Sequence, residues 1–146
     1  MNSVLNNPAS YITIGENIHT TRSLLRKGKR IDTVDDVDVI LYTAVDGSAQ
    51  TLLIPDDVKA TQDYDEGRVK HVKVALSAAM FGSAEAAENG LAYIHAMAHH
   101  QEQTGATFLD INVDEFSLKT EEQKAAMTWL VGAVQNMSPL PISVDS

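Results

Sequence analysis

The C-terminal two thirds of the chain alternate between helix-like and strand-like segments, and this rhythm constrains the fold more than any other feature. Apolar residues repeat at helical spacing over residues 66–80, over a segment that begins after Ser83 and ends at Gly105, and over residues 121–136. β-Prone runs lie at residues 107–113 and 142–144. Because this order is typical of parallel βα units, we expect an α/β fold with parallel strands.

Local signals define the ends of several of these elements. Ser83 is a suitable N-cap for the second helix, and Thr120-Glu121-Glu122-Gln123 has the capping-box pattern expected at the start of the third. Near the N-terminus, the β-prone run from Tyr11 to Gly15 stops at a glycine. We therefore expect a first strand that delivers Glu16 and Asn17 at its carboxyl end.

A β-hairpin is predicted in the first half of the chain. Residues 37–45 and 51–54 are β-prone and flank Asp46-Gly47, a pair that tolerates the positive φ of a tight turn. Pro55 ends the second arm, because proline has no N–H to donate to a ladder. A simple βα unit needs only about thirty residues. We therefore interpret the hairpin and the 66–80 helix as an insertion, about residues 20–82, after the first strand.

Polar side chains follow each of the three expected parallel strands. They are Glu16 and Asn17 at the first strand, Asp110, Asn112, Asp114 and Glu115 at the second, and Asp145 at the third. Parallel sheets bind ligands at the carboxyl ends of their strands, where such side chains converge. The set as a whole favours a polar ligand, while each residue alone has the alternative role of capping the turn that follows it.

Composition and charge exclude several classes of function. The 146 residues include 20 acidic and 11 basic side chains, and the net charge of −9 disfavours binding to a nucleic-acid backbone. The absence of cysteine excludes disulfides, iron–sulfur clusters and thiolate metal sites. No apolar run is long enough for a membrane span, and the first residues do not resemble a secretion signal. We therefore expect a cytoplasmic protein with no membrane or nucleic-acid partner.

Two local clusters have alternative interpretations. Five cations gather between Arg22 and Arg30, either as a solvated basic turn or as a loop that contacts an anion. His95 and His99 have the i, i+4 spacing of zinc ligands on a helix, but the glutamate of the zinc motif is absent. We interpret them as surface histidines, and the sequence predicts no metal site.

Three stretches of the sequence resemble the pterin-binding barrel superfamily. They are Ile14-Gly15-Glu16-Asn17-Ile18-His19-Thr20, the segment from Phe108 to Glu115, and Pro141-Ile142-Ser143-Val144-Asp145-Ser146. Within the superfamily, the match is most similar to methyltetrahydrofolate methyltransferases, including the folate domain of cobalamin-dependent methionine synthase. Dihydropteroate synthases share the aspartate of the third strand, but the Asn-Val-Thr-Pro-Asp-Ser-Phe stretch with which they usually open is absent here.

The resemblance implies a fold and a set of binding residues. Residues 1–146 would form a partial pterin-binding domain, the N-terminal portion of a (β/α)8 TIM barrel. Asp145 would accept hydrogen bonds from the amino group and ring N–H of the pterin, and Asp110, Asn112 and Glu16 would line the same mouth. No catalytic residue is assigned. The motif arginine and asparagine of the family are replaced by Asn17 and His19, so the first-strand contacts should differ.

The resemblance also implies a reaction. The N5 methyl of the substrate methyltetrahydrofolate would pass to the cobalt of a reduced corrinoid on a partner protein or domain, with no metal in this chain. The inserted segment would be a lid, a docking surface for the corrinoid protein, or a decoration without function. The alternatives are a dihydropteroate synthase-like enzyme and a non-catalytic fragment that binds a ligand or partner.

Chain length sets a further expectation about activity. A complete barrel takes about 250 residues, and three βα units leave an open parallel edge. We therefore expect the chain alone to be inactive, and either to self-associate or to need a missing C-terminal barrel half.

Overall fold

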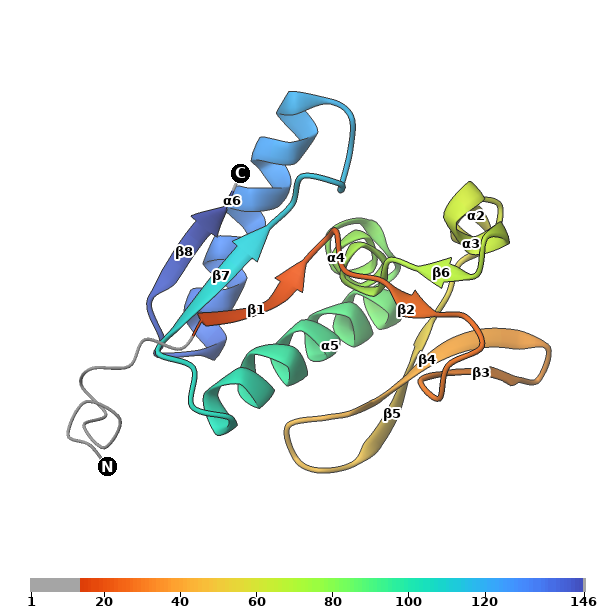
Figure 1. Ribbon diagram of the computed structural model, residues 1–146, viewed down its shortest axis with the longest axis horizontal. Coiled ribbons are helices and arrows are strands. Elements are labelled where there is room, and N and C mark those ends of the chain that lie inside the picture. The colour runs from red at the N-terminus through yellow and green to blue at the C-terminus, as the bar shows by residue number, and fades with distance from the viewer. Residues whose placement is uncertain (1–13, 146) are drawn as a thin grey trace, which may run out of the picture.

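A three-stranded parallel sheet lies at the centre of the protein (Figure 1). The computed structural model describes residues 14–145, apart from the side chains of Ile14 and Glu16. The strands are β1 (Ile14–His19), β7 (Phe108–Asn112) and β8 (Ile142–Asp145), in the order β1-β7-β8 with each parallel to its neighbour. The expected α/β fold with a parallel sheet is confirmed.

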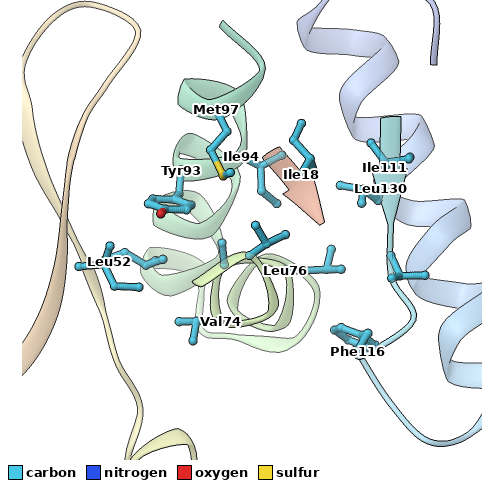
Figure 2. Packing of buried hydrophobic residues seen from close by; sticks show 14 of the residues in the cluster. Ile18, Leu52, Val74, Leu76, Tyr93, Ile94, Met97, Ile111, Phe116 and Leu130 are labelled. Atoms are coloured by element: carbon cyan, nitrogen blue, oxygen red, sulfur yellow. The ribbon is translucent and has the colours of Figure 1, made fainter. Parts of the chain in front are cut away.

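Two long helices cover one face of this sheet. α5 (Ala84–Gln103) precedes β7 and contacts β1, and α6 (Thr120–Met137) connects β7 to β8 and contacts α5. Ile111 of β7 is opposite Ile18 of β1 in the register and lies beside Leu130 of α6 (Figure 2). Because side chains alternate along a strand, Asp110 and Asn112 point to the other face. The sheet therefore has an apolar face beneath the helices and a polar face opposite.

The hydrophobic core extends from the sheet through α4 (His71–Phe81) to the inserted strands. Figure 2 shows Ile18 and Ile94 near Leu76 of α4, with Tyr93 and Leu52 farther along the same core. α4 and α5 approach closely where Gly90 lies. A Cβ atom at Gly90 would lie 2.4 Å from the carbonyl oxygen of Ala75, so only glycine fits this contact.

The segment between β1 and α4 is mostly β-structure. β3 (Ile31–Val34), β4 (Val37–Thr43) and β5 (Ala49–Leu53) form an antiparallel sheet, followed by the short helices α2 (Asp56–Lys59) and α3 (Gln62–Asp65). The β4–β5 hairpin is confirmed, with Gly47 at a φ of 89° in its turn. The sequence did not reveal β3 as a third strand.

A two-stranded ribbon closes the base of this segment. β2 (Leu24–Leu25) pairs with β6 (Arg68–Val69) in an antiparallel ladder. Next to the ladder, the Arg26 N–H donates to the Gly67 carbonyl over 2.8 Å. The prediction of a helix over 66–80 is therefore wrong at its start, because residues 68 and 69 form a strand and the helix begins at His71.

One other predicted boundary and one predicted cap are wrong, while the helix expected over 121–136 is confirmed as α6 and both ends of α5 are as expected. β1 continues past Gly15 to His19, so Glu16 and Asn17 lie within the strand and not after it. The capping box at Thr120 does not form: the N-cap is Lys119, whose N–H is instead bonded by the Ser117 hydroxyl. Ser83 caps α5 as expected, and Gly105 follows its end with a φ of 92°.

Within residues 14–145, no helix combines the length and the apolar character that crossing a bilayer requires.

Candidate functional site

One row of polar side chains crosses the carboxyl ends of the three parallel strands. His19 of β1 is opposite Asn112 of β7, and Asn112 is opposite Asp145 of β8. Residues directly opposite in neighbouring strands point to the same face of a sheet. Asp110 lies two residues before Asn112 and so shares this face. The parallel register therefore brings Asp110, Asn112 and Asp145 together, as the sequence predicted.

A one-residue irregularity in β1 places His19 in this row. Gly15 pairs with Leu109, and Ile18 pairs with Ile111. Between these two pairs β1 advances by three residues while β7 advances by two. Without the extra residue, Ile18 would face Asn112 and the alternation of side chains would be reversed. The bulge thus buries Ile18 in the core and turns His19 toward the polar face.

His19 has unusual surroundings for a buried imidazole. The residue is only 7% exposed, and its Nε2 atom has no hydrogen-bond partner among residues 14–145. Nε2 lies 3.3 Å from Oδ2 of Asp110, without the alignment that a hydrogen bond requires. One ligand atom each from His19, Asp110 and Asp145 lie within 4.8 Å of one another.

Asn112 has a different role from its neighbours in the row. Its Oδ1 atom accepts a hydrogen bond of 2.9 Å from the Asp114 N–H, and its Nδ2 atom donates to the Asp114 carboxylate over 2.9 Å. The Thr20 hydroxyl lies 3.5 Å from the same Oδ1 and accepts from the Glu115 N–H. This is an Asx-type turn, so the Asn112 amide holds the loop after β7 in place. The sequence predicted that Asn112 contacts a ligand, but its amide is hydrogen-bonded to Asp114 instead.

The loop after β7 is also tied to the inserted segment. The Glu115 carboxylate pairs with the Lys70 ammonium, which also lies 3.3 Å from an oxygen of Asp63. Burial acts to lower the pKa of Lys70, but the two carboxylates outweigh it and raise the pKa above its ordinary value. The polar row therefore lies beside a loop that is anchored to Thr20, directly after β1, and to Lys70, directly after β6.

The remaining predicted residues lie apart from the row. Asn17 donates from Nδ2 to the Met97 carbonyl of α5 over 3.2 Å, so its side chain is turned to the helix face. Glu16 lies at the bulge of β1, and its side chain is outside the described parts of the structure. The sequence analysis assigned no binding role to His19, because the bulge that turns it toward the polar face lies after Gly15, where the strand was expected to stop.

A separate cavity of about 650 Å³ lies between the inserted sheet and α5. Tyr93 of α5 is one of the residues that line it: the Tyr93 oxygen accepts a hydrogen bond of 2.7 Å from Arg30 and lies 2.7 Å from Nδ1 of His71. Arg30 also donates to the Leu41 carbonyl over 3.2 Å. Part of the predicted basic cluster is therefore structural, because Arg30 joins the inserted segment to α5.

The protonation states of this network follow from burial and charge. Burial, followed by the positive charges of Arg30 and Arg22, lowers the pKa of His71 to about 4. Burial is also the main cause that raises the pKa of Tyr93 to about 12. At neutral pH His71 is neutral and Tyr93 is protonated, so we assign the Tyr93 O–H as the donor to Nδ1 of His71, while the Tyr93 oxygen accepts from Arg30. Nothing in the sequence indicated that these three residues meet.

Comparison with known proteins finds no similar protein. Neither protein-family models, nor curated proteins, nor solved structures include a match to the chain. The functional interpretation therefore depends on the residues at the strand ends.

The chemistry of the polar row is that of hydrogen-bond acceptance. Asp110 is half-buried and Asp145 is exposed at the end of β8. Carboxylates in this position accept from paired N–H donors of a heterocycle or coordinate a cation.

Proposed function

We propose that this chain contributes the pterin-binding part of a methyltetrahydrofolate-dependent methyltransferase. The observation behind the proposal is the placement of Asp110 and Asp145 on one face of a parallel sheet, at the carboxyl ends of adjacent strands. This is where parallel α/β folds bind their ligands. The resemblance of the sequence to methyltetrahydrofolate methyltransferases supplies the identity of the ligand.

The strand order and the placement of the helices support a fold derived from a barrel. The strands follow one another in chain order, β1-β7-β8, and α5 and α6 contact each other on one face. Barrels have this arrangement, whereas doubly wound sheets place helices on both faces. We therefore infer that the three strands are the N-terminal portion of a (β/α)8 barrel, with residues of about 20–82 inserted after the first strand.

Asp145 is the principal pterin ligand in this proposal. A carboxylate offers two acceptor oxygens, which match the adjacent amino group and ring N–H of a pterin. Its exposure leaves the oxygens accessible to a ligand. Asp110 provides a second acceptor on the same face, and Asn112 supports the site through the loop after β7.

The residues of this chain bind and orient the substrate and do not attack it. The corrinoid, on a partner protein or domain, would supply the cobalt that accepts the N5 methyl. When the methyl group leaves, N5 retains the electron pair of the broken bond, and carboxylates that hold the pterin ring fix the position of that nitrogen. The inserted segment, joined to the loop after β7 through Lys70 and Glu115, is the part of the chain placed to contact the partner.

The test is a calorimetric titration of methyltetrahydrofolate into the wild type and Asp145→Asn. The amide loses one acceptor and turns an NH₂ group toward a ring N–H, so affinity should fall about tenfold to a hundredfold, the equivalent of ~1.5–3 kcal/mol. Asp65→Asn, the same change at an exposed aspartate of α3, is the matched control and should leave affinity unchanged.

Thermal melts of the same variants separate binding from structure. A pterin ligand at Asp145 predicts a melting temperature close to that of the wild type. Unchanged affinity together with a lower melting temperature would show that Asp145 only caps the end of β8, and the proposal would be wrong.

A further inference from the structure

We propose that His19, Asp110 and Asp145 form a binding site for a divalent transition-metal cation. Each residue lies on a different strand of the parallel sheet, and one ligand atom from each lies within 4.8 Å of the others. The inference goes beyond the proposed function, which gives no role to the His19 imidazole. It also involves none of the helical histidines, His95 and His99, on which the sequence-based expectation of no metal site depended.

The His19 imidazole is buried, and its Nε2 atom has no hydrogen bond to any described residue. The side chain is 9% exposed, and Nε2 faces the Asp110 carboxylate without the alignment of a hydrogen bond. A buried nitrogen without a partner is unfavourable, because it has lost its bonds to water and gained none. A cation bound between Nε2 and the carboxylate would satisfy both groups.

The spacing of the ligand atoms of His19 and Asp110 matches that of a tetrahedral site. Zinc bound by histidine and carboxylate has bonds of about 2.0–2.2 Å, which separate neighbouring tetrahedral ligands by about 3.3–3.6 Å. The observed Nε2 to Oδ2 distance is 3.3 Å. Asp145 is exposed, so rotation of its side chain can bring the third ligand to the same spacing without a change in the backbone. Three protein ligands leave a coordination position for water or a bound molecule.

The donor set determines the class of cation. Mg²⁺ and Ca²⁺ prefer sites made only of oxygen, whereas an imidazole favours Zn²⁺, Cu²⁺, Fe²⁺ or Ni²⁺, and the two carboxylates suit Mn²⁺ as well. The two carboxylates compensate the charge of a divalent ion and distinguish the site from a thiolate centre. The site should therefore bind Mn²⁺ and bind Zn²⁺ more tightly, while it discriminates against Mg²⁺.

The test is a titration of the full chain with Mn²⁺ in excess Mg²⁺, followed by the loss of the spectrum of free Mn²⁺ in electron paramagnetic resonance. Excess Mg²⁺ occupies the weak acidic surface sites that a chain of net charge −9 offers. We expect one Mn²⁺ per chain, displaced by Zn²⁺. Asp145→Asn and His19→Gln should each weaken Mn²⁺ binding by at least about tenfold, whereas Asp65→Asn should not change it.

Three results would overturn the inference. The first is that Mn²⁺ binding does not saturate, and the second is that excess Mg²⁺ prevents Mn²⁺ from binding. The third is that Asp145→Asn binds Mn²⁺ with an affinity within about threefold of the wild type. Because Asp145 is exposed, this variant decides the question even if the buried His19→Gln variant does not fold.

A parallel titration with methyltetrahydrofolate distinguishes this inference from the proposed function. A wild-type chain that binds folate but not Mn²⁺ or Zn²⁺ disproves the metal site alone, and His19 and Asp110 are then a simple polar pair. A chain that binds the cation but no folate disproves the pterin proposal alone.

Discussion

The Tyr93 hydroxyl lies 2.7 Å from Nδ1 of His71, and this contact joins the middle of α5 to the first residue of α4. The same oxygen accepts from Arg30, which precedes β3. Three elements of the chain therefore meet at one buried oxygen. Since the network is screened from water, its loss should be measurable in the free energy of unfolding.

Removal of that oxygen should destabilise the protein. Tyr93→Phe leaves His71 Nδ1 without a donor and removes an acceptor from Arg30, so the free energy of unfolding should fall by about 1–3 kcal/mol. Urea denaturation monitored by circular dichroism measures the change. Tyr42→Phe is the control, because the Tyr42 hydroxyl makes no hydrogen bond with the described residues, and it should change stability by less than about 0.5 kcal/mol. Equal effects of the two variants would contradict a structural role for the Tyr93 oxygen.

His71 should make the protein sensitive to acid. Its pKa is about 4 in the folded protein and 6.5 in the unfolded chain, so the unfolded state binds more protons between these values. The stability that neutral His71 provides is complete above pH 6.5 and is lost as the pH falls to 4, by a total of about 3 kcal/mol. His71→Gln keeps an acceptor for Tyr93 but does not titrate, and should show a shallower loss in denaturation curves across this range. His100→Gln is the control, because it retains His71 and should lose as much stability as the wild type. If His71→Gln lost as much stability on acidification as the wild type, His71 would not be the residue responsible.

Two glycines in helices should respond to alanine in opposite directions. At Gly90 a methyl group would lie 2.4 Å from the Ala75 carbonyl and 2.8 Å from the Ala79 nitrogen, both backbone atoms, so Gly90→Ala should cost about 1–3 kcal/mol. At Gly132 of α6, apart from the backbone of the helix itself, no atom of the described residues lies within 4 Å of the new Cβ position, so Gly132→Ala should stabilise the protein by about 0.5–1 kcal/mol. Thermal melts of the two variants give the comparison. A stabilised Gly90→Ala variant would mean that α4 and α5 are not in this close contact.

β8 should promote self-association. Within the described residues β8 pairs with β7 alone, and its Val144 is 54% exposed beside half-buried Ile142. Parallel strands are normally covered on both faces, so we expect light scattering to show a species larger than the monomer. Val144→Lys should reduce association, whereas Leu118→Lys, at an exposed leucine before α6, should not. A wild-type monomer at high concentration that binds no hydrophobic dye would rule this out.

The elements that sequence predicted well are those whose signals are local. Ser83 and Gly105 mark α5 at both ends, and Asp46-Gly47 marks the β4–β5 turn, because each acts on backbone within a few residues. β2 and β6 have two residues each and pair across more than forty positions, so no local pattern identifies them. The helix predicted from residue 66 failed for the same reason, since pairing with β2 determines the conformation of Arg68 and Val69.

The candidate site was predictable where it depends on strand register and not where it depends on a bulge. The proximity of Asp110 and Asp145 could be predicted, because the two parallel strands that carry them end at the same edge of the sheet. The extra residue between Gly15 and Ile18 decides which side chain of β1 joins them, and a bulge has no reliable sequence signature at this position. His19 was therefore noted in the sequence only as a departure from a family motif.

The ribbon of β2 and β6 has a consequence for how this protein can vary between species. Because the chain leaves and returns at Arg26 and Gly67, which share a hydrogen bond, everything between them begins and ends at one point in space. A change in the length of an exposed turn within residues 27–66, such as Asp46-Gly47, alters this excursion while the buried residues that pack it against α5 stay in place. Evolution can therefore vary this region by single genetic events while the three parallel strands keep their register.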